Sequence, residues 1–347
     1  MQQIALDAMG GDLGTSELVA GAVQAVQQYN VRMVLIGEEK LIRAALLELG
    51  GHESDLLQII HAPQVICMDE SPFDAVRKKK DSSIVRAFHL LKEKKVDAVV
   101  SAGNSGATMA AAIRYLGRLA TVSRPGIAGI YPTLIDPVVM MDVGANVDCR
   151  PQHLLQFGAM AAAFSEVVMQ KERPRVGLLS IGEEGGKGNT LVKKTHELFQ
   201  QSRLNYIGNV EGRDIFMGNV DVIVCDGFVG NVCLKVSEGL AEAILQMLRD
   251  EISRSLKAKI GYSLAKEAFA NFKKRVDYAE YGGAPLLGLN GTGIICHGRS
   301  NAKAISNAVR VAKELVANNV NDRIETLLSH VAQPDSAFDK SDVQEMR

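Results

Sequence analysis

The sequence lacks the features that mark several classes of protein. Its 39 basic and 40 acidic residues nearly cancel, so no global field favours nucleic acid and any basic partner site must be local. The five cysteines show no CxxC or Cys/His metal spacing, and their odd number argues against a disulfide framework. The longest apolar stretch, 154–169, contains Gln156, Ser165 and Glu166 and falls short of a membrane span. The N-terminal MQQIALDAMGGD resembles a strand and loop rather than a signal peptide, so we expect a soluble, cytoplasmic protein.

Several catalytic signatures are also missing. There is no Walker A spacing, no dinucleotide fingerprint and no Ser/His/Asp or Cys/His arrangement, and His196 and His297 are isolated in the sequence. Carboxylates end two apolar runs in DAMGGD and DVGANVD, but no His or Glu completes a ligand set. We therefore expect no cofactor and no required metal, although Mg²⁺ accompanying phosphate stays open.

Glycine, with 32 residues, and a regular alternation of apolar runs with helical patterns are what the chain does have. The alternation predicts an α/β fold: a doubly wound, mostly parallel sheet with helices on both faces and two lobes sharing a cleft. We see no repeat and no low-complexity linker, so residues 1–331 are predicted to form one domain, followed by a disordered polar tail, 332–347. The predicted strands are 3–9, 32–37, 56–62, 96–102, 125–131, 137–143, 175–181, 205–210, 221–227 and 293–298.

Four of the apolar runs are followed by a loop rich in glycine, asparagine and aspartate and then by a predicted helix. These segments are 99–112, 138–151, 177–190 and 222–235. In an open α/β sheet the ligand binds beyond the carboxyl ends of the strands. Glycines there let the backbone approach closely, and the free N–H groups of the next helix suit an anion. Four such ends converging would make one phosphate-sized site.

Each loop offers candidate side chains, and each has a simpler structural explanation. Gly103, Asn104, Ser105 and Gly106 suit a phosphate, but such a turn also caps helices. Lys187 stands among glycines and suits a bound anion, or it is a solvated loop lysine. Asp226 and Asn231 offer a proton acceptor and an oxyanion donor, or an Asx turn and helix cap. The remaining candidates for phosphate or substrate binding are Asn146, Gly188, Asn189 and Gly227.

Taken together, these motifs resemble the bacterial phosphate acyltransferase family. The resemblance covers about residues 2–330 and is carried by DAMGGD, RKKKDSS, SAGNSGATMA, DVGANVDCRP, GLLSIGEE with GKGN, GNVEGRDI, CDGFVGNV and YGGAPLLGLNG. It implies an enzyme that makes acyl-phosphate from acyl-[acyl carrier protein] and orthophosphate for phospholipid synthesis. It also implies a fold related to phosphotransacetylases, a homodimer that associates reversibly with the inner face of the cell membrane, and a membrane glycerol-3-phosphate acyltransferase that takes the product.

A mechanism follows as a hypothesis. The loop 103–106 and Lys187 bind phosphate, and Asn231 with the backbone N–H groups of 227–231 polarises the thioester carbonyl. Asp226 orients Lys187 or accepts the remaining proton of phosphate. The pantetheine thiolate then leaves.

An acidic carrier protein requires a basic face, for which the sequence has two candidates. One is the run containing Arg77, Lys79 and Lys80. The other is 251–275, with seven basic and two acidic residues, whose apolar spacing predicts a protruding pair of amphipathic helices broken at Gly261. This arm could pack against a second copy of the chain in a dimer, or it could lie on an anionic membrane. The two roles are compatible. Its contact candidates are Arg254, Leu256, Lys257, Lys259 and Ile260.

Other functions remain open on this reading. A short-chain phosphotransacetylase that uses coenzyme A is the nearest enzyme alternative, and a decarboxylating dehydrogenase is less well supported. The non-enzyme alternative is a scaffold that binds acyl carrier protein without turnover.

Overall fold

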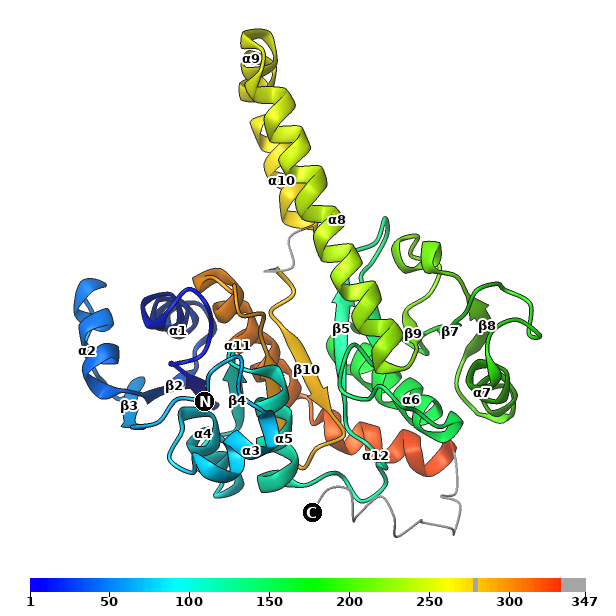
Figure 1. Ribbon diagram of the computed structural model, residues 1–347, viewed down its shortest axis with the longest axis horizontal. Helices are drawn as coiled ribbons and strands as arrows, with labels where there is room; N and C mark the ends of the chain where they lie inside the picture. The colour runs from blue at the N-terminus through cyan, green and yellow to red at the C-terminus, as the bar shows by residue number, and fades with distance from the viewer. Residues whose placement is uncertain (277–279, 332–347) are drawn as a thin grey trace.

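In the computed structural model, which describes residues 1–276 and 280–331, eleven strands form one sheet in the order β3-β2-β1-β4-β11-β10-β5-β6-β9-β7-β8. Figure 1 shows one lobe at each end of this sheet and a helical arm rising between the lobes. We call the half built on β1, β2, β3, β4 and β11 the N-lobe, and the half built on β6, β7, β8 and β9 the C-lobe. The strands are β1 (Gln3–Asp7), β2 (Arg32–Gly37), β3 (Leu57–His61), β4 (Ala98–Ser101), β5 (Gly126–Tyr131), β6 (Val138–Met141), β7 (Val176–Leu179), β8 (Tyr206–Val210), β9 (Val222–Val224), β10 (Ala284–Leu287) and β11 (Thr292–Ile295).

Helices cover both faces of the sheet, as the alternation predicted. On one face α1, α6 and α11 pack over a core that includes Leu18, Phe157 and Ile305. On the other face α4 and α5 pack over a core that includes Phe88 and Ala111. The helices are α1 (Thr15–Tyr29), α2 (Glu39–Glu48), α3 (Pro72–Lys78), α4 (Ser83–Lys92), α5 (Ser105–Leu116), α6 (Pro151–Val168), α7 (Thr190–Gln201), α8 (Gly227–Ser253), α9 (Leu256–Leu264), α10 (Lys266–Val276), α11 (Ala302–Ala317) and α12 (Val320–Val331), with a 3₁₀ turn at η1 (Gly212–Phe216).

The middle of the sheet contains three antiparallel pairings. β11 runs parallel to β4, but β10 is antiparallel to β11, β5 to β10 and β6 to β5. An odd number of reversals makes the parallel strands of the C-lobe run opposite to those of the N-lobe. Because neighbouring strands in a sheet rotate by about 20–25°, the four steps from β4 to β6 also turn the lobes by roughly 80–100° relative to one another.

The arm is confirmed as a protruding helical element but differs in detail from the prediction. In Figure 1 the long α8 leaves the body, α9 forms the tip and α10 returns beside α8. Gly261 lies inside α9, so the predicted break there is wrong. The helices separate at Ala265, and the rings of Tyr262 and Phe269 pack across this turn at 5.0 Å between centroids. The predicted tail, 332–347, lies outside the described residues.

Candidate functional site

The carboxyl ends of β1, β4 and β11 meet in the N-lobe. The buried carboxylate of Asp7 accepts hydrogen bonds from Ser101 Oγ at 2.8 Å and from the backbone N–H of Met9 at 3.1 Å. Burial raises the pKa of Asp7, and hydrogen bonds from Ser83 and Ser101 oppose that rise. A Cβ at Gly10 would come within 2.4 Å of the nitrogen of Gly103, so these two loops touch backbone to backbone.

Asn104 is a helix cap in this structure. Its Oδ1 accepts the backbone N–H of Ala107 at the start of α5, at 3.0 Å. Its Nδ2 donates to the carbonyl oxygens of Cys67, Met68 and Glu70, at 3.1–3.2 Å. The geometry therefore favours the capping alternative for this side chain, and any anion contact from the loop comes from the exposed first turn of α5, at Ser105 and Gly106.

In the C-lobe, Asp142 organises the loop after β6. Its carboxylate is fully buried and accepts the backbone N–H groups of Ile127, Gly144, Ala145 and Asn146 as well as the side-chain amide of Asn146. Burial raises the pKa of Asp142, and these hydrogen bonds oppose the rise. Asn146 also donates from its side chain to the carbonyl of Pro125 at 2.9 Å. Both side chains shape the loop.

The same loop holds the start of α8, which follows β9. The N–H of Gly227 donates to the carbonyl of Asn146 at 2.7 Å, and Asp226 caps the helix by accepting the N–H of Val229 at 2.9 Å. Asp226 is thus a helix cap in this structure, which was the simpler of the two explanations for this residue. Asn231 is exposed, and its Oδ1 lies 3.5 Å from the position of a Cβ on Gly144. Within the described chain, Phe228 supplies the one N–H of 227–229 that has no partner.

The loop after β7 carries Lys187, whose side chain is exposed. The carbonyl oxygen of Glu184 accepts two hydrogen bonds, from the backbone N–H of Lys187 at 2.9 Å and from Asn209 Nδ2 at 2.9 Å. Gly188 has a φ of 93°, and Asn189 caps α7 by accepting the N–H of Val192 at 2.9 Å. Since β7 lies beside β9, this loop is next to the strand end that carries Asp226.

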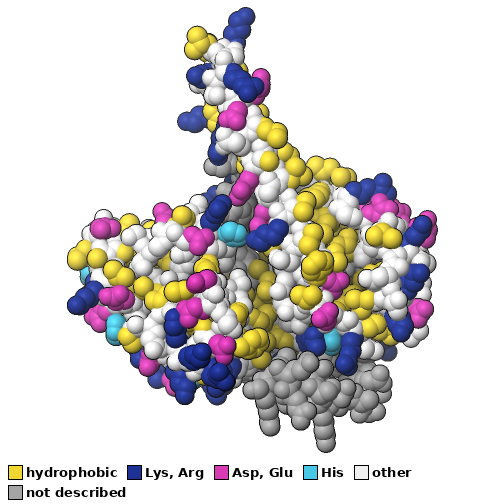
Figure 2. Space-filling view, viewed as in Figure 1, with side chains coloured by type: hydrophobic (Ala, Val, Ile, Leu, Met, Phe, Trp, Pro, Cys, Tyr) yellow, Lys and Arg dark blue, Asp and Glu magenta, His cyan; other side chains and the backbone are white. Residues whose placement is uncertain are grey.

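The expectation that all four strand ends converge needs correction. The loops after β6 and β9 interlock, with the loop after β7 on the neighbouring strand, but the loop 103–106 belongs to the N-lobe group. The reversed strand direction explains the split, because the carboxyl ends of the two lobes do not share an edge of the sheet. Figure 2 shows a furrow between the lobes at the foot of the arm, where α8 of the C-lobe group approaches the N-lobe group through Glu238 and His297.

Side chains absent from the sequence prediction bridge this furrow. Glu238 on α8 lies 3.8 Å from Nε2 of His297, which follows β11, and Lys235 Nζ lies 2.8 Å from the same carboxylate oxygen. His297, isolated in the sequence, is therefore clustered in the structure. The spacing of Asn231, Lys235 and Glu238 at i, i+4 and i+7 was the available signal, because it places all three on one helix face.

The basic run near α3 is partly committed to structure. Arg77 pairs with Asp74 at 3.0 Å, and Lys79 is half-buried and donates to the carbonyl of Val65 at 2.7 Å. Lys80 is exposed. Hydrogen bonds from the N–H of Cys67 and from Lys79 lower the pKa of Glu70. Lys79 thus supports the 65–70 loop, while Arg77 and Lys80 remain available at the surface.

The tip of the arm carries an exposed apolar stripe flanked by lysines. Leu256, Ile260 and Leu264 recur every four residues along α9 and are 79, 63 and 87% exposed. Lys257 and Lys259 are also exposed there, and Arg254 pairs with Glu251 at 2.8 Å.

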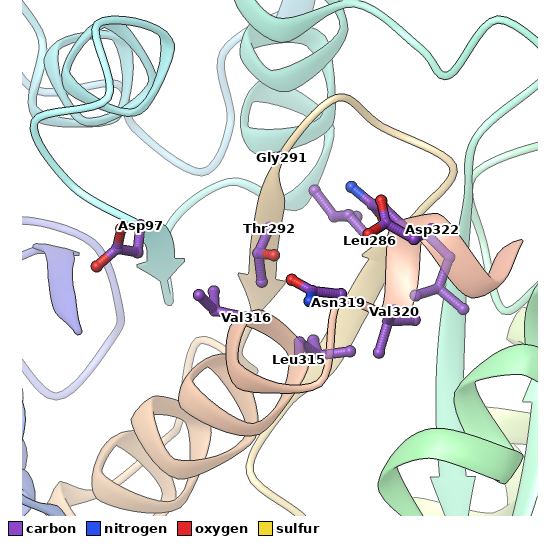
Figure 3. Close-up of a pocket in the computed structure, with 11 residues that line it drawn as sticks. Asp97, Leu286, Gly291, Thr292, Leu315, Val316, Asn319, Val320 and Asp322 are labelled. Carbon is purple, nitrogen blue, oxygen red and sulfur yellow. The ribbon is translucent and has the colours of Figure 1, made fainter. Parts of the chain in front are cut away.

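Two cavities lie away from the strand-end loops. One of about 190 Å³ is shown in Figure 3, where Asp97 and Thr292 mark the amino ends of β4 and β11 beside Asn319. The other, of about 430 Å³, is lined by the end of α6, by α11 and by Tyr281. Neither corresponds to the predicted phosphate site. Over residues 1–276 and 280–331 we find no group of three or more metal-ligating side chains and no helix able to cross a membrane.

Comparison with known proteins gives a consistent result. A family model described as "Fatty acid synthesis protein" matches residues 2–323. The phosphate acyltransferase of Syntrophotalea carbinolica is 57% identical over 321 residues, 92% of each chain. That of Pelotomaculum thermopropionicum is 51% identical over 330 residues, 95% of this chain and 96% of the relative. Among solved structures, a phosphotransacetylase from Streptococcus pyogenes aligns with a TM-score of 0.61 at 17% identity, covering 91% of this chain and 94% of that one, which indicates a shared fold.

Proposed function

The chain belongs to the phosphate acyltransferase family of fatty acid synthesis proteins, and from this premise we propose that it transfers a fatty acyl group from acyl-[acyl carrier protein] to orthophosphate, giving acyl-phosphate for glycerophospholipid synthesis. The observation that carries the proposal is the identity of 48–57% with relatives named phosphate acyltransferase over more than nine-tenths of the chain. Membership makes the protein an acyltransferase enzyme. The donor and the product are the proposed part.

The arrangement of the strand-end loops supports a phosphate acceptor. The first turn of α5 presents the backbone N–H groups of Ser105 and Gly106, at the positive end of the helix dipole. Lys187 is exposed on the C-lobe side and adds a mobile positive charge. A dianion held between these elements would lie in the furrow.

The reaction requires a positioned nucleophile and an oxyanion site, and no covalent enzyme intermediate. An oxygen of the phosphate dianion attacks the thioester carbonyl carbon, the C–S bond breaks, and the thiolate leaves with the bonding electron pair. The proton of the phosphate hydroxyl ends on the thiol, so one proton moves from phosphate to sulfur. Asp226 is the group we assign to accept it first or to orient Lys187, because its Oδ1 accepts the N–H of Val229 and the carboxylate has further lone pairs for this role.

The start of α8 would stabilise the oxyanion. Asn231 is exposed beside Gly144, and the N–H of Phe228 lies one turn earlier in the same helix. A side-chain amide and a backbone N–H are the donors that commonly stabilise tetrahedral oxyanions. The N–H groups of Gly227 and Val229 already have hydrogen-bond acceptors. We therefore limit the backbone donors of the oxyanion site to Phe228, instead of the whole 227–231 turn expected from the sequence.

The acyl donor is the point on which the nearest alternative differs. In our proposal the donor is a long-chain acyl group on acyl carrier protein, which is acidic. The exposed Arg77, Lys80 and the basic residues of the arm offer places for this carrier to dock. A short-chain phosphotransacetylase would instead use acetyl-coenzyme A. Purified protein should therefore be assayed with both donors under equal phosphate. A higher kcat/KM with acetyl-coenzyme A would replace our proposal by the alternative.

We assign two further properties to the arm, homodimer formation and reversible association with the inner face of the cell membrane. Exposed apolar side chains recur every three or four residues along α8, on the side opposite Asn231, Lys235 and Glu238: Val229, Val232, Val236, Leu240, Ile244 and Met247. A stripe of this length suits a second copy of the chain. Replacing Leu240 and Ile244 by Glu should convert a dimer to a monomer in analytical ultracentrifugation. A wild-type monomer would refute the dimer.

The product would then pass to a membrane glycerol-3-phosphate acyltransferase, which the arm tip brings within reach when Leu256 and Ile260 enter the headgroup region. A scaffold without catalysis would bind acyl carrier protein but release no thiol. Phosphate-dependent release of free thiol from acyl-[acyl carrier protein] separates the two.

A further inference from the structure

His297 lies at the N-lobe edge of the furrow, beside the loop proposed to bind phosphate. It follows Cys296, whose N–H donates to the carbonyl of Ser101 at 2.8 Å on the adjacent strand β4. The carbonyl of the next residue, Gly298, accepts the N–H of Asp12 at 2.6 Å. These bonds on either side hold the backbone of His297 within the group of strand ends that includes Gly103.

From the other lobe, α8 presents a polar face to this imidazole. Asn231, Lys235 and Glu238 share that face, and the Glu238 carboxylate reaches His297 Nε2 at 3.8 Å. Lys235 lies 2.8 Å from the same carboxylate oxygen and neutralises it, so the bridge does not confront a phosphate dianion with an unpaired negative charge. Figure 2 shows histidine, basic and acidic side chains adjoining one another where the arm meets the body.

The hydrogen bonding of His297 defines which nitrogen carries the proton. Nδ1 accepts the backbone N–H of Arg299 at 3.1 Å, so in the neutral ring the proton is on Nε2, the atom that faces Glu238. At 3.8 Å the contact to Glu238 is longer than a hydrogen bond. With Nδ1 engaged by the backbone, Nε2 is the ring nitrogen that can donate a hydrogen bond.

We propose that His297 is a substrate-binding residue that donates from Nε2 to an oxygen of the phosphate bound at the start of α5, and that Glu238 and Lys235 are positioning residues that orient it across the furrow. The inference rests on the proposed function, because it takes orthophosphate as the acceptor. It also gives the N-lobe a second phosphate contact, from the residue that follows β11, opposite Lys187 of the C-lobe, while α8 carries the oxyanion donor.

The test compares four variants of the full-length protein: His297→Ala, His297→Gln, Glu238→Gln and, as a matched control, the exposed His52→Ala. Phosphate and acyl donor are varied separately, and phosphate binding is also measured directly by calorimetric titration. Loss of a hydrogen bond to a charged group predicts that His297→Ala raises the KM for phosphate about 10- to 100-fold and leaves the KM for the acyl donor unchanged. His297→Gln should recover most of the loss, because its amide places an N–H near the position of Nε2. His52→Ala should match the wild type.

Glu238→Gln tests the positioning role through its coupling to His297. It should weaken phosphate use in the wild-type background and have no further effect in His297→Ala. Equal effects in both backgrounds would show that Glu238 does not act through the histidine.

An unchanged phosphate KM in His297→Ala, or equal rises in both KM values, would overturn the inference while leaving the proposed function standing. If the wild type binds phosphate, His297→Ala does not, and no acyl transfer occurs with either donor, the proposed function fails and the phosphate site survives. If His297→Ala does not fold, the same comparison is made with His297→Gln against His297→Leu.

Discussion

Gly230 of α8 packs directly against the backbone of Asp142: a Cβ on Gly230 would lie 1.9 Å from the carbonyl oxygen of Asp142. Gly227, one turn earlier, also lies close to backbone: a Cβ added there would be 2.6 Å from the carbonyl oxygen of Asn146. The start of α8 is therefore located by backbone contact with the loop after β6. This contact fixes the helix that carries Asn231, Lys235 and Glu238 toward the furrow.

Gly230→Ala should destabilise the fold and displace the start of α8. A methyl group cannot share space with a backbone carbonyl, and overpacking of this kind destabilises by about 1–3 kcal/mol. Gly239→Ala is the matched control, because nothing lies within 4 Å of its Cβ position on the same helix. It should stabilise by about 0.5–1 kcal/mol, the usual gain for alanine over glycine in a helix. Denaturant unfolding of both variants measures the two effects, and equal shifts would contradict the close approach.

Asn231→Ala should lower kcat by about 10²–10³ with the fold intact, the typical loss for one oxyanion donor. The control is Gln246→Ala, which removes an exposed amide farther along α8. Unfolding curves of both variants should superimpose on the wild type. An Asn231→Ala enzyme with wild-type kcat would remove this residue from the mechanism.

Lys187→Ala should raise the KM for phosphate about tenfold or more, since a charge-assisted contact to an anion is lost. Lys187→Arg should retain most of the affinity because the charge stays. Lys194→Ala, an exposed lysine on α7, controls for a general loss of positive charge. If Lys187→Ala and Lys194→Ala behave alike in steady-state kinetics, Lys187 is the solvated loop lysine of the simpler explanation.

Charge reversal at the arm tip should weaken binding to anionic vesicles. A basic residue near an anionic surface contributes about 1 kcal/mol, so Lys257→Glu with Lys259→Glu should reduce the affinity by roughly tenfold or more. The control reverses two exposed lysines of the N-lobe, Lys40 and Lys92. Vesicle sedimentation at low ionic strength gives the partition of each, and equal binding by the two double variants would argue against the membrane role.

Elements with strong local signals were predictable from the sequence. β2 spans Arg32–Gly37, the boundaries predicted for it, because the apolar pattern and the flanking turn residues agree there. β10 was missed, although its residues stand in YGGAPLLGLNG. A four-residue strand that contains Pro285 and is flanked by glycines has the local appearance of a turn, and only pairing with β5 and β11 makes it a strand.

The sequence predicted which residue types form the candidate site better than it predicted how those residues are arranged in space. Loop composition correctly indicated helix starts at Asn104, Asn189 and Asp226, but a capping residue and an anion ligand have the same sequence pattern. Which role a side chain takes depends on partners far away in the chain, such as the carbonyl groups of 67–70 for Asn104. The approach of Glu238 to His297 depends on the reversed middle of the sheet, which no local pattern encodes.

The account is tested most directly by following thiol release from long-chain acyl-[acyl carrier protein] as phosphate is varied. The wild type should release free carrier thiol in saturable dependence on phosphate, with acyl-phosphate formed in equal amount, and Asn231→Ala should do so far more slowly. Binding of the carrier without phosphate-dependent thiol release would contradict the enzyme we describe and leave a scaffold in its place.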